Sequence, residues 1–137
     1  MIGIVIVAHG GLAREFRAAV EHVVGPLSGV TTIATHPDDD RAAKQAEICA
    51  AADSVDQGQG VVIVTDLWGG SPCNLSLMAC GGADRRILSG ANLPLLIKLA
   101  KSRTRPVDEA VSLAAEAGRK YIGTPEAPRP VLRNWGT

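Results

Sequence analysis

The chain has 137 residues, a length that favours one compact domain able to bury a core without disulfide or metal support. Hydrophobic residues make up 46% of the chain and charged residues 20%, which is typical of a globular protein and argues against disorder. Fourteen basic and fourteen acidic residues give zero net charge, so no overall positive field favours nucleic acid or anionic lipid as a partner.

The lack of a recognisable targeting signal, together with the cysteine usage, favours a cytoplasmic protein. The longest apolar run, residues 1–8, is too short to span a bilayer and has no basic leader, so we expect neither a signal peptide nor insertion into a membrane. The cysteines are Cys49, Cys73 and Cys80, an odd number without a CxxC pair. We therefore expect reduced thiols.

Four short apolar runs predict the strands of a sheet that is buried on both faces. The runs are rich in Ile and Val, and glycine or polar residues end them. They cover residues 2–7, 30–35, 61–64 and 86–89. A last short strand is expected at residues 119–123, before a Pro-rich tail. We predict a single domain over residues 1–124 and a loosely held tail over residues 125–137.

Between these runs, apolar residues recur at helical spacing and predict five helices. In the first helix, Leu12, Phe16 and Val20 form the apolar face, opposite charged side chains. Ser71 and Pro72 supply an N-cap and a first-turn proline for the third helix. The predicted helices span residues 12–24, a segment opened by Asp38, Asp39 and Asp40 that ends near residue 55, then 71–80, 93–101 and 107–117, with Gly118 after the last.

This alternation of strands and helices predicts an α/β fold with a parallel, doubly wound sheet. Such sheets bind ligands beyond the carboxyl ends of their strands, where the winding direction switches. With strand order 2-1-3-4, the first and third strands flank that crevice. His9 follows the first strand and Asp66 follows the third, so the fold brings an imidazole and a carboxylate to the expected site.

The residues around this crevice suit a phosphoryl group better than a nucleotide. The chain has neither a GxGxxG nor a GxxxxGK[ST] loop. Two glycine-rich turns, with Gly10 and Gly11 in one and Gly69 and Gly70 in the other, precede helices whose first amides bind anions. Neutral imidazole attacks phosphorus with one nitrogen when a carboxylate holds the proton on the other. The hypothesis is that His9 is the nucleophile and Asp66 its partner.

Simpler explanations exist for the same residues. His9 also fits a solvated histidine, Asp66 a turn or helix cap, and Ser71 an N-cap alone. His22 and His36 receive no functional role. His36 with residues 38–40 would bind a divalent ion weakly, but acidic residues at a helix start explain that cluster better. Trp68 is either a lid over the crevice or a packed loop residue.

Three blocks of sequence resemble one known family. They are residues 4–10 (IVIVAHG), 66–74 (DLWGGSPCN) and 90–95 (GANLPL), and they occur in the order and at the spacing of that family. The chain resembles the enzyme IIA component of the mannose family of the bacterial phosphoenolpyruvate-dependent sugar phosphotransferase system. The resemblance covers residues 1–123, and the central block is the specific one.

The resemblance implies that His9 is transiently phosphorylated by the carrier HPr, that Asp66 orients its imidazole, and that Ser71 and nearby backbone amides contact the phosphoryl group. It implies a flavodoxin-like sheet of four parallel strands, and a homodimer that exchanges a C-terminal antiparallel strand, here at residues 119–123. No metal or organic cofactor is expected. Cys73 departs from the family, which often has an aromatic or apolar residue there, and we expect it to be a small packing residue.

The predicted function is that of a phosphotransferase component, a phosphohistidine carrier in sugar uptake. Because the sequence ends soon after the IIA unit, the expected acceptor is a separate IIB protein. The alternative is a regulatory phosphoprotein of an incomplete phosphotransferase system, in which the charge added at the crevice changes binding to a partner. A third reading is a small metal chelatase or a hydrolase, but no converging ligand set and no GxSxG elbow accompany His9.

Overall fold

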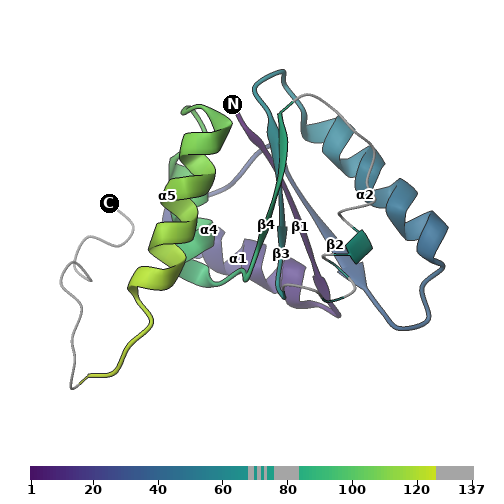
Figure 1. The fold of residues 1–137 in the computed structure, drawn as a ribbon, viewed down its shortest axis with the longest axis horizontal. Helices are drawn as coiled ribbons and strands as arrows, with labels where there is room; N and C mark the ends of the chain where they lie inside the picture. The colour runs from purple at the N-terminus through teal and green to yellow at the C-terminus, as the bar shows by residue number, and fades with distance from the viewer. Residues whose placement is uncertain (68–69, 71, 73, 76–83, 126–137) are drawn as a thin grey trace.

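The computed structural model describes residues 1–67, 70, 72, 74–75 and 84–125 of the chain. It confirms the predicted α/β fold, with four parallel strands in the order β2-β1-β3-β4. Helices cover both faces of the sheet (Figure 1). The elements are β1 Gly3–His9, α1 Leu12–Val24, β2 Val30–Thr35, α2 Arg41–Val55, β3 Val61–Thr65, β4 Arg85–Ser89, α4 Leu93–Lys101 and α5 Val107–Lys120.

Strand β1 divides its side chains between two hydrophobic cores, because successive residues of a strand point to opposite faces. Ile4 and Ile6 pack in the core that α1, α4 and α5 cover, and Val5 and Val7 pack in the core under α2. Figure 1 shows α2 alone on its side of the sheet among the labelled helices. Burial on both faces explains why the strands appear in the sequence as continuous apolar runs rather than alternating ones.

The edge strand β4 is held by ion pairs on both of its faces. Arg85 Nη2 lies 2.7 Å from Asp53 Oδ1 on α2, and 3.2 Å from Asp56 Oδ2 just beyond that helix. On the other face, Arg86 Nε lies 2.7 Å from Asp108 Oδ1 on α5. The Arg86 guanidinium lowers the pKa of the Asp108 carboxyl below its ordinary value by hydrogen bonding and by charge. These pairs offset the weak apolar character of β4.

Helices α4 and α5 pack closely because Gly118 lies inside their contact. The sequence predicted that Gly118 ends the last helix, but α5 continues to Lys120. A Cβ atom on Gly118 would lie 3.1 Å from Leu95 Cβ on α4, so a larger residue would push the helices apart. Asn92 joins the same helices, since its Oδ1 accepts from Leu95 N at 3.0 Å and its Nδ2 donates to Gly118 O at 2.9 Å. The GANLPL block therefore has a structural explanation.

The predicted strand at residues 119–123 is not present in the single chain. Arg119 and Lys120 form the last turn of α5, and the described residues that follow, 121–125, make no strand. The reason is that the helical pattern continues past Gly118, whose missing side chain is used for packing. A strand formed against a second chain stays a prediction. The predicted tail lies outside the described residues from residue 126 onward.

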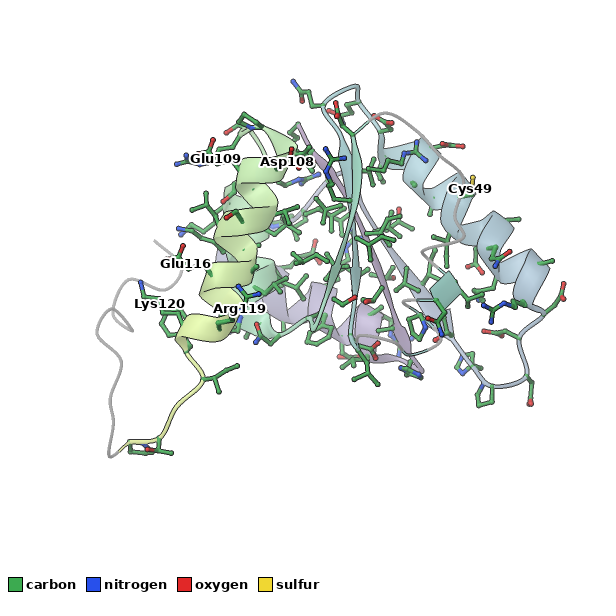
Figure 2. The ribbon with its side chains drawn as sticks, viewed as in Figure 1. Cys49, Asp108, Glu109, Glu116, Arg119 and Lys120 are labelled. Carbon is green, nitrogen blue, oxygen red and sulfur yellow. The ribbon has the colours of Figure 1, made fainter. Side chains whose placement is uncertain are left out.

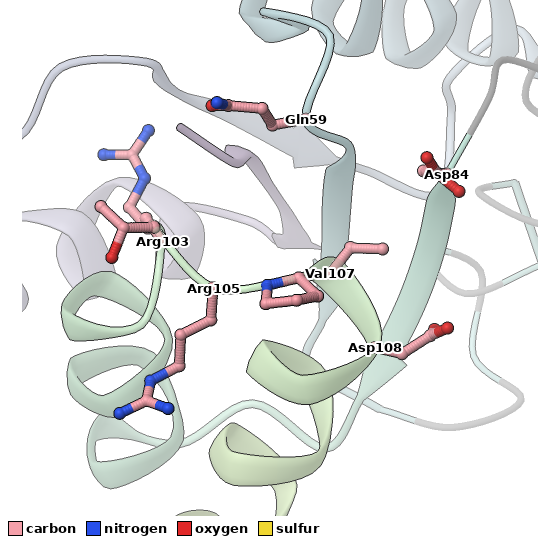
Figure 3. Close-up of a pocket in the computed structure, with 8 residues that line it drawn as sticks. Gln59, Asp84, Arg103, Arg105, Val107 and Asp108 are labelled. Atoms are coloured by element: carbon pink, nitrogen blue, oxygen red, sulfur yellow. The ribbon is translucent and has the colours of Figure 1, made fainter.

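Arg103 lies at the end of the sheet where the strands begin, and it is only 5% exposed. Its guanidinium donates to the carbonyl oxygens of Ile2, Ser28 and Gly29 at 2.7, 2.7 and 3.1 Å, and burial lowers its pKa. A pocket of about 410 Å³ lies at this end of the sheet, and Arg103 is among the residues that line it. Figure 3 shows these side chains. Acidic and basic side chains both line the pocket.

Cys49 on α2 is disulfide-bonded, which contradicts the expectation that the cysteines are reduced. The expectation rested on cysteine count and spacing, and these do not show which thiols the fold brings together. Cys73 and Cys80 lie outside the described residues. In Figure 2, Cys49 lies on the side of the molecule opposite to α5, which carries Glu116, Arg119 and Lys120.

Among the helices of the described ranges, none has the length and apolar character needed to cross a membrane.

Candidate active site

The carboxyl ends of β1 and β3 bring His9 and Asp66 together as the sequence predicted. The two strands are direct neighbours, and Val7 pairs with Thr65 in their register. Beyond this pair, β1 ends at His9, and Asp66 is the first residue after β3. The order β2-β1-β3-β4 places the switch in winding direction between these two strands.

Asp66 holds the imidazole of His9 through one carboxylate oxygen. His9 Nδ1 lies 2.9 Å from Asp66 Oδ2, and the backbone N–H of His9 donates to the same oxygen at 3.1 Å. A carboxylate oxygen only accepts, so this contact puts the proton on Nδ1 and leaves the ring lone pair on Nε2. The His9 side chain is 51% exposed and that of Asp66 10%, so an anchored imidazole is open to a reactant.

The other oxygen of Asp66 is buried, and in the part of the chain that the structure describes it has no hydrogen-bond partner. Within the described part of the chain, the hydrogen bonds that this carboxylate accepts both come from His9. By contrast, Asp40 has the geometry of a helix cap, because its carboxylate accepts from Ala43 N at 3.2 Å at the start of α2. The arrangement at Asp66 therefore suits an orienting group rather than a cap.

Near His9, some backbone amides already donate to carbonyl oxygens, and others lie at the start of a helix. The N–H of Gly10, where φ is +56°, donates to Thr35 O at 3.0 Å, and the N–H of Gly70 donates to Leu67 O at 3.4 Å. Gly11 is the N-cap of α1, whose first helical hydrogen bond runs from Glu15 N to Gly11 O. The backbone amides between Gly11 and Glu15 lie at the start of α1, where N–H groups without a helical partner and the helix dipole favour anions.

Gly70 borders the imidazole directly. A Cβ atom placed on it would lie 3.4 Å from His9 Cε1 and 3.4 Å from Leu67 Cδ2. The second glycine-rich turn therefore reaches the His9 ring, as expected for a turn that follows β3. The predicted phosphoryl contacts of Gly69 and Ser71, and the predicted lid Trp68, lie outside the described residues.

The other histidines lie apart from this pair in the chain. His22 is in the last turn of α1, and His36 follows β2. The backbone N–H of His36 donates to Asp39 Oδ2 at 2.7 Å, and this hydrogen bond lowers the pKa of the Asp39 carboxyl. Lys44 Nζ lies 3.6 Å from the same carboxylate. Among the described residues, no group of three or more His, Cys, Asp or Glu side chains has an arrangement suited to a metal ion.

The exposure of two leucines that follow His9 and Asp66 in the chain was missed by sequence reasoning. Leu12 was predicted on the buried face of the first helix, but it is 40% exposed. It opens α1, so no preceding turn of that helix covers it. Leu67, directly after Asp66, is 57% exposed. The only sequence signal for Leu67 is an apolar residue in a loop between a strand and a glycine-rich turn.

The chain matches a known protein family over most of its length. The model of a family called EIIA-man, described as the PTS system fructose IIA component, matches residues 3–115. The chain belongs to this family of phosphotransferase-system IIA components. A IIA chain of this kind is a component of a sugar phosphotransferase system, and the resemblance stated from the three sequence blocks is confirmed.

Solved structures and a curated relative agree with this assignment. A mannose/sorbose specific IIA subunit from Enterococcus faecalis has a TM-score of 0.82 at 27% identity, over 93% of this chain and 97% of that chain. An EIIA component from Streptococcus agalactiae has a TM-score of 0.80 at 26% identity, over 90% of this chain and 97% of the other. The mannose-specific EIIAB component of Escherichia coli K12 is 30% identical over 124 residues. That match covers 88% of this IIA chain but only 38% of the longer protein.

Proposed function

We propose that this chain is a phosphocarrier, which accepts a phosphoryl group from phospho-HPr on Nε2 of His9 and passes it to a IIB acceptor in sugar uptake. The observation that carries the proposal is the hydrogen bond of 2.9 Å between His9 Nδ1 and Asp66 Oδ2 at the carboxyl edge of the sheet. It presents Nε2 with a free lone pair on an imidazole that is half exposed. Membership of the IIA family supports the same reaction.

The transfer needs no acid or base beyond this pair. The Nε2 lone pair forms the new N–P bond while the bond between phosphorus and the donor nitrogen breaks, and the donor nitrogen keeps that electron pair. The His9 ring gains positive character as the new bond forms, and the ionised Asp66 stabilises it through Nδ1–H. In the second transfer, a nucleophile of the acceptor forms a bond to phosphorus while the bond between phosphorus and Nε2 breaks, and Nε2 keeps that electron pair. Asp66 thus acts as an orienting and charge-stabilising group and does not take the proton.

We assign the phosphoryl oxygens to backbone amides at the start of α1, within three residues of His9. This turn carries the positive end of the helix dipole. Gly11 begins it, while the amides of Gly10 and Gly70 already donate to carbonyl oxygens in this structure. Gly69 and Ser71, which the sequence predicts to contact the phosphoryl group, are the remaining members of the proposed cradle.

A homodimer is part of the proposal. Strand β4 is half-buried and lies at the edge of the four-stranded sheet, and an edge strand is a place where a further strand can pair. Ile122, two residues beyond α5, is 66% exposed. We propose that the C-terminal segment of a second copy pairs with β4 and covers such apolar surface. Light scattering after size exclusion is expected to give twice the chain mass, and a monomer at micromolar concentration would contradict this part.

The test of the carrier function is intact-mass spectrometry after incubation with phosphoenolpyruvate, enzyme I and HPr. Wild-type protein is expected to gain one acid-labile phosphoryl group. His9→Ala is expected to gain none, because no nucleophile remains at the crevice. His22→Ala and His36→Ala are matched controls that keep His9, and both are expected to gain the group. Labelling of His9→Ala, or no labelling of wild type by active enzyme I and HPr, would overturn the proposal.

A further inference from the structure

Strand β3 ends in a buried hydroxyl group directly before Asp66. Thr65, the last residue of the strand, is 0% exposed. Its Oγ1 lies 2.7 Å from Oγ of Ser89, the last residue of β4 and its partner in the register of the sheet. Val61 and Ile63, which precede Thr65 on the same face of β3, belong to the apolar core under α2. A hydroxyl group in such a layer is costly without a hydrogen bond, so this bond holds the ends of β3 and β4 together.

The turn that follows β4 holds Thr65 through its backbone. The N–H of Ala91 donates to Thr65 O at 3.0 Å. Asn92, the next residue, caps α4 through its Oδ1 and donates from Nδ2 to Gly118 O on α5. The end of β3 is therefore tied to β4 by a side-chain hydrogen bond, and to the start of α4 by a backbone one.

The place of Asp66 depends on this anchored strand end. The pairing of β1 with β3 ends at Val7 and Thr65, one residue before Asp66. In the described ranges, the carboxylate of Asp66 accepts hydrogen bonds from His9 alone, and its Oδ1 has no partner. Both bonds thus come from the residue that Asp66 has to orient. The support that is independent of His9 is the peptide link to Thr65.

A small displacement of Asp66 would act on the nucleophile. The contact between His9 Nδ1 and Asp66 Oδ2 is 2.9 Å, and it keeps the ring proton on Nδ1. A neutral imidazole can carry its proton on either nitrogen, so a longer contact lets the proton move to Nε2, where it occupies the lone pair that attacks phosphorus. Misplacing a catalytic group by 1 Å costs about 100-fold in rate.

On the basis of the proposed function, we infer that Thr65 is a positioning residue for the transfer. Its hydrogen bond to Ser89 fixes the end of β3, so that Asp66 keeps the proton of His9 on Nδ1 and the lone pair on Nε2. Because Thr65 is fully buried, a donor protein does not contact it. Its loss is therefore expected to lower kcat and to leave KM for the donor unchanged.

The kinetic test exchanges the Thr65 hydroxyl for a methyl group in the full chain. Thr65→Val keeps the branched shape at Cβ, and Thr65→Ser keeps the hydroxyl. Thr32→Val is the matched control, since it makes the same exchange in β2, three residues before the end of that strand. For Thr65→Val, kcat with phospho-HPr is expected to fall about three- to tenfold, less than a misplacement of 1 Å would cause, with KM within about twofold of wild type. Thr65→Ser and Thr32→Val are expected to keep the wild-type kcat.

A second readout needs no phosphoryl donor. The ¹⁵N chemical shifts of the His9 ring, recorded where the ring is neutral, report which nitrogen carries the proton. Wild type and Thr65→Ser are expected to carry it on Nδ1, and Thr65→Val is expected to gain a population with the proton on Nε2. Ser89→Ala removes the same hydrogen bond from its other side. The double variant with Thr65→Val is therefore expected to lose no more in kcat than the more affected single variant.

The outcomes separate positioning from stability and from the carrier function. Wild-type kcat and ring protonation in a folded Thr65→Val protein overturn the inference, even when its free energy of unfolding falls, because the hydroxyl pair then serves stability alone. A raised KM with unchanged kcat overturns it as well, and so do additive losses in the double variant. If phospho-HPr fails to label wild type, the proposed function is refuted, while the ring spectra still decide whether Thr65 positions Asp66.

Discussion

Replacing Asp66 with Asn separates the charge of the carboxylate from its geometry. Both hydrogen bonds to Asp66 Oδ2, from Nδ1 and from the backbone N–H, are donated by His9. The amide oxygen of an Asn side chain still accepts both, so the ring orientation and the proton on Nδ1 persist in Asp66→Asn. What disappears is the negative charge that stabilises the ring as it becomes cationic.

The size of the effect follows from that single change. A hydrogen bond to a charged group contributes about 1.5–3 kcal/mol, and a neutral one about 0.5–1.5 kcal/mol. The lost difference of about 1–1.5 kcal/mol lowers the transfer rate roughly tenfold. Asp66→Ala also loses the orientation of the ring, and its rate is expected to fall at least about 100-fold.

Rapid-quench measurement of single-turnover transfer from phospho-HPr tests this prediction. The free energy of unfolding serves as the control for folding. The buried Oδ1 of Asp66 has no hydrogen-bond partner among the described residues, and the NH2 group of Asn would stand in its place, so the substitution breaks no hydrogen bond there. We expect the free energy of unfolding of Asp66→Asn to stay within about 1 kcal/mol of wild type. A folded Asp66→Asn protein with the wild-type rate would refute the charge argument, and equal rates for the Asn and Ala variants would refute the orienting role.

Three further predictions concern the scaffold. Gly118→Ala is expected to destabilise the fold by about 1 kcal/mol in chemical denaturation despite the higher helix propensity of Ala, because its Cβ would meet Leu95 Cβ at 3.1 Å; a stabilised variant would show that α4 and α5 move apart freely. Arg103→Met leaves three backbone carbonyls without their donor, so we expect a loss of about 3 kcal/mol in the free energy of unfolding, and a loss below about 1 kcal/mol would contradict the account. Arg86 lowers the pKa of Asp108, so this pair stabilises the fold above the unfolded-state pKa of about 3.9 and the effect is lost as pH falls through the lower folded-state pKa. Urea titrations of wild type and Asp108→Asn are therefore expected to converge in acid, and a constant difference down to about pH 2 would count against the pair.

The sheet and the central pair were accessible from sequence because local and global signals agree there. Short Ile- and Val-rich runs ending in glycine or polar residues have few alternatives to buried parallel strands. Once the order β2-β1-β3-β4 is assumed, the neighbours β1 and β3 must end side by side, and His9 meets Asp66. The capping residues Asp40 and Asn92 likewise act locally, and both accept hydrogen bonds at helix starts.

The features that sequence reasoning missed depend on contacts between distant segments. Gly118 predicts a helix end by local propensity, but tertiary packing against α4 uses its missing side chain and the helix continues. Leu12 fits a buried helical face by periodicity, yet its place at the first turn leaves it exposed. The disulfide at Cys49 depends on spatial proximity, which spacing along the chain does not reveal. The exposure of Leu67 follows from the path of the chain after β3.

The central claim is that Nε2 of His9 carries the phosphoryl group while Asp66 keeps Nδ1 protonated. Long-range ¹⁵N–¹H correlation spectra of the phosphorylated protein, recorded with detection of phosphorus–nitrogen coupling, identify the nitrogen directly. The account predicts coupling to Nε2 of His9 and a proton on Nδ1 of the same ring. Coupling to Nδ1 of His9, or to a ring nitrogen of His22 or His36, would contradict it.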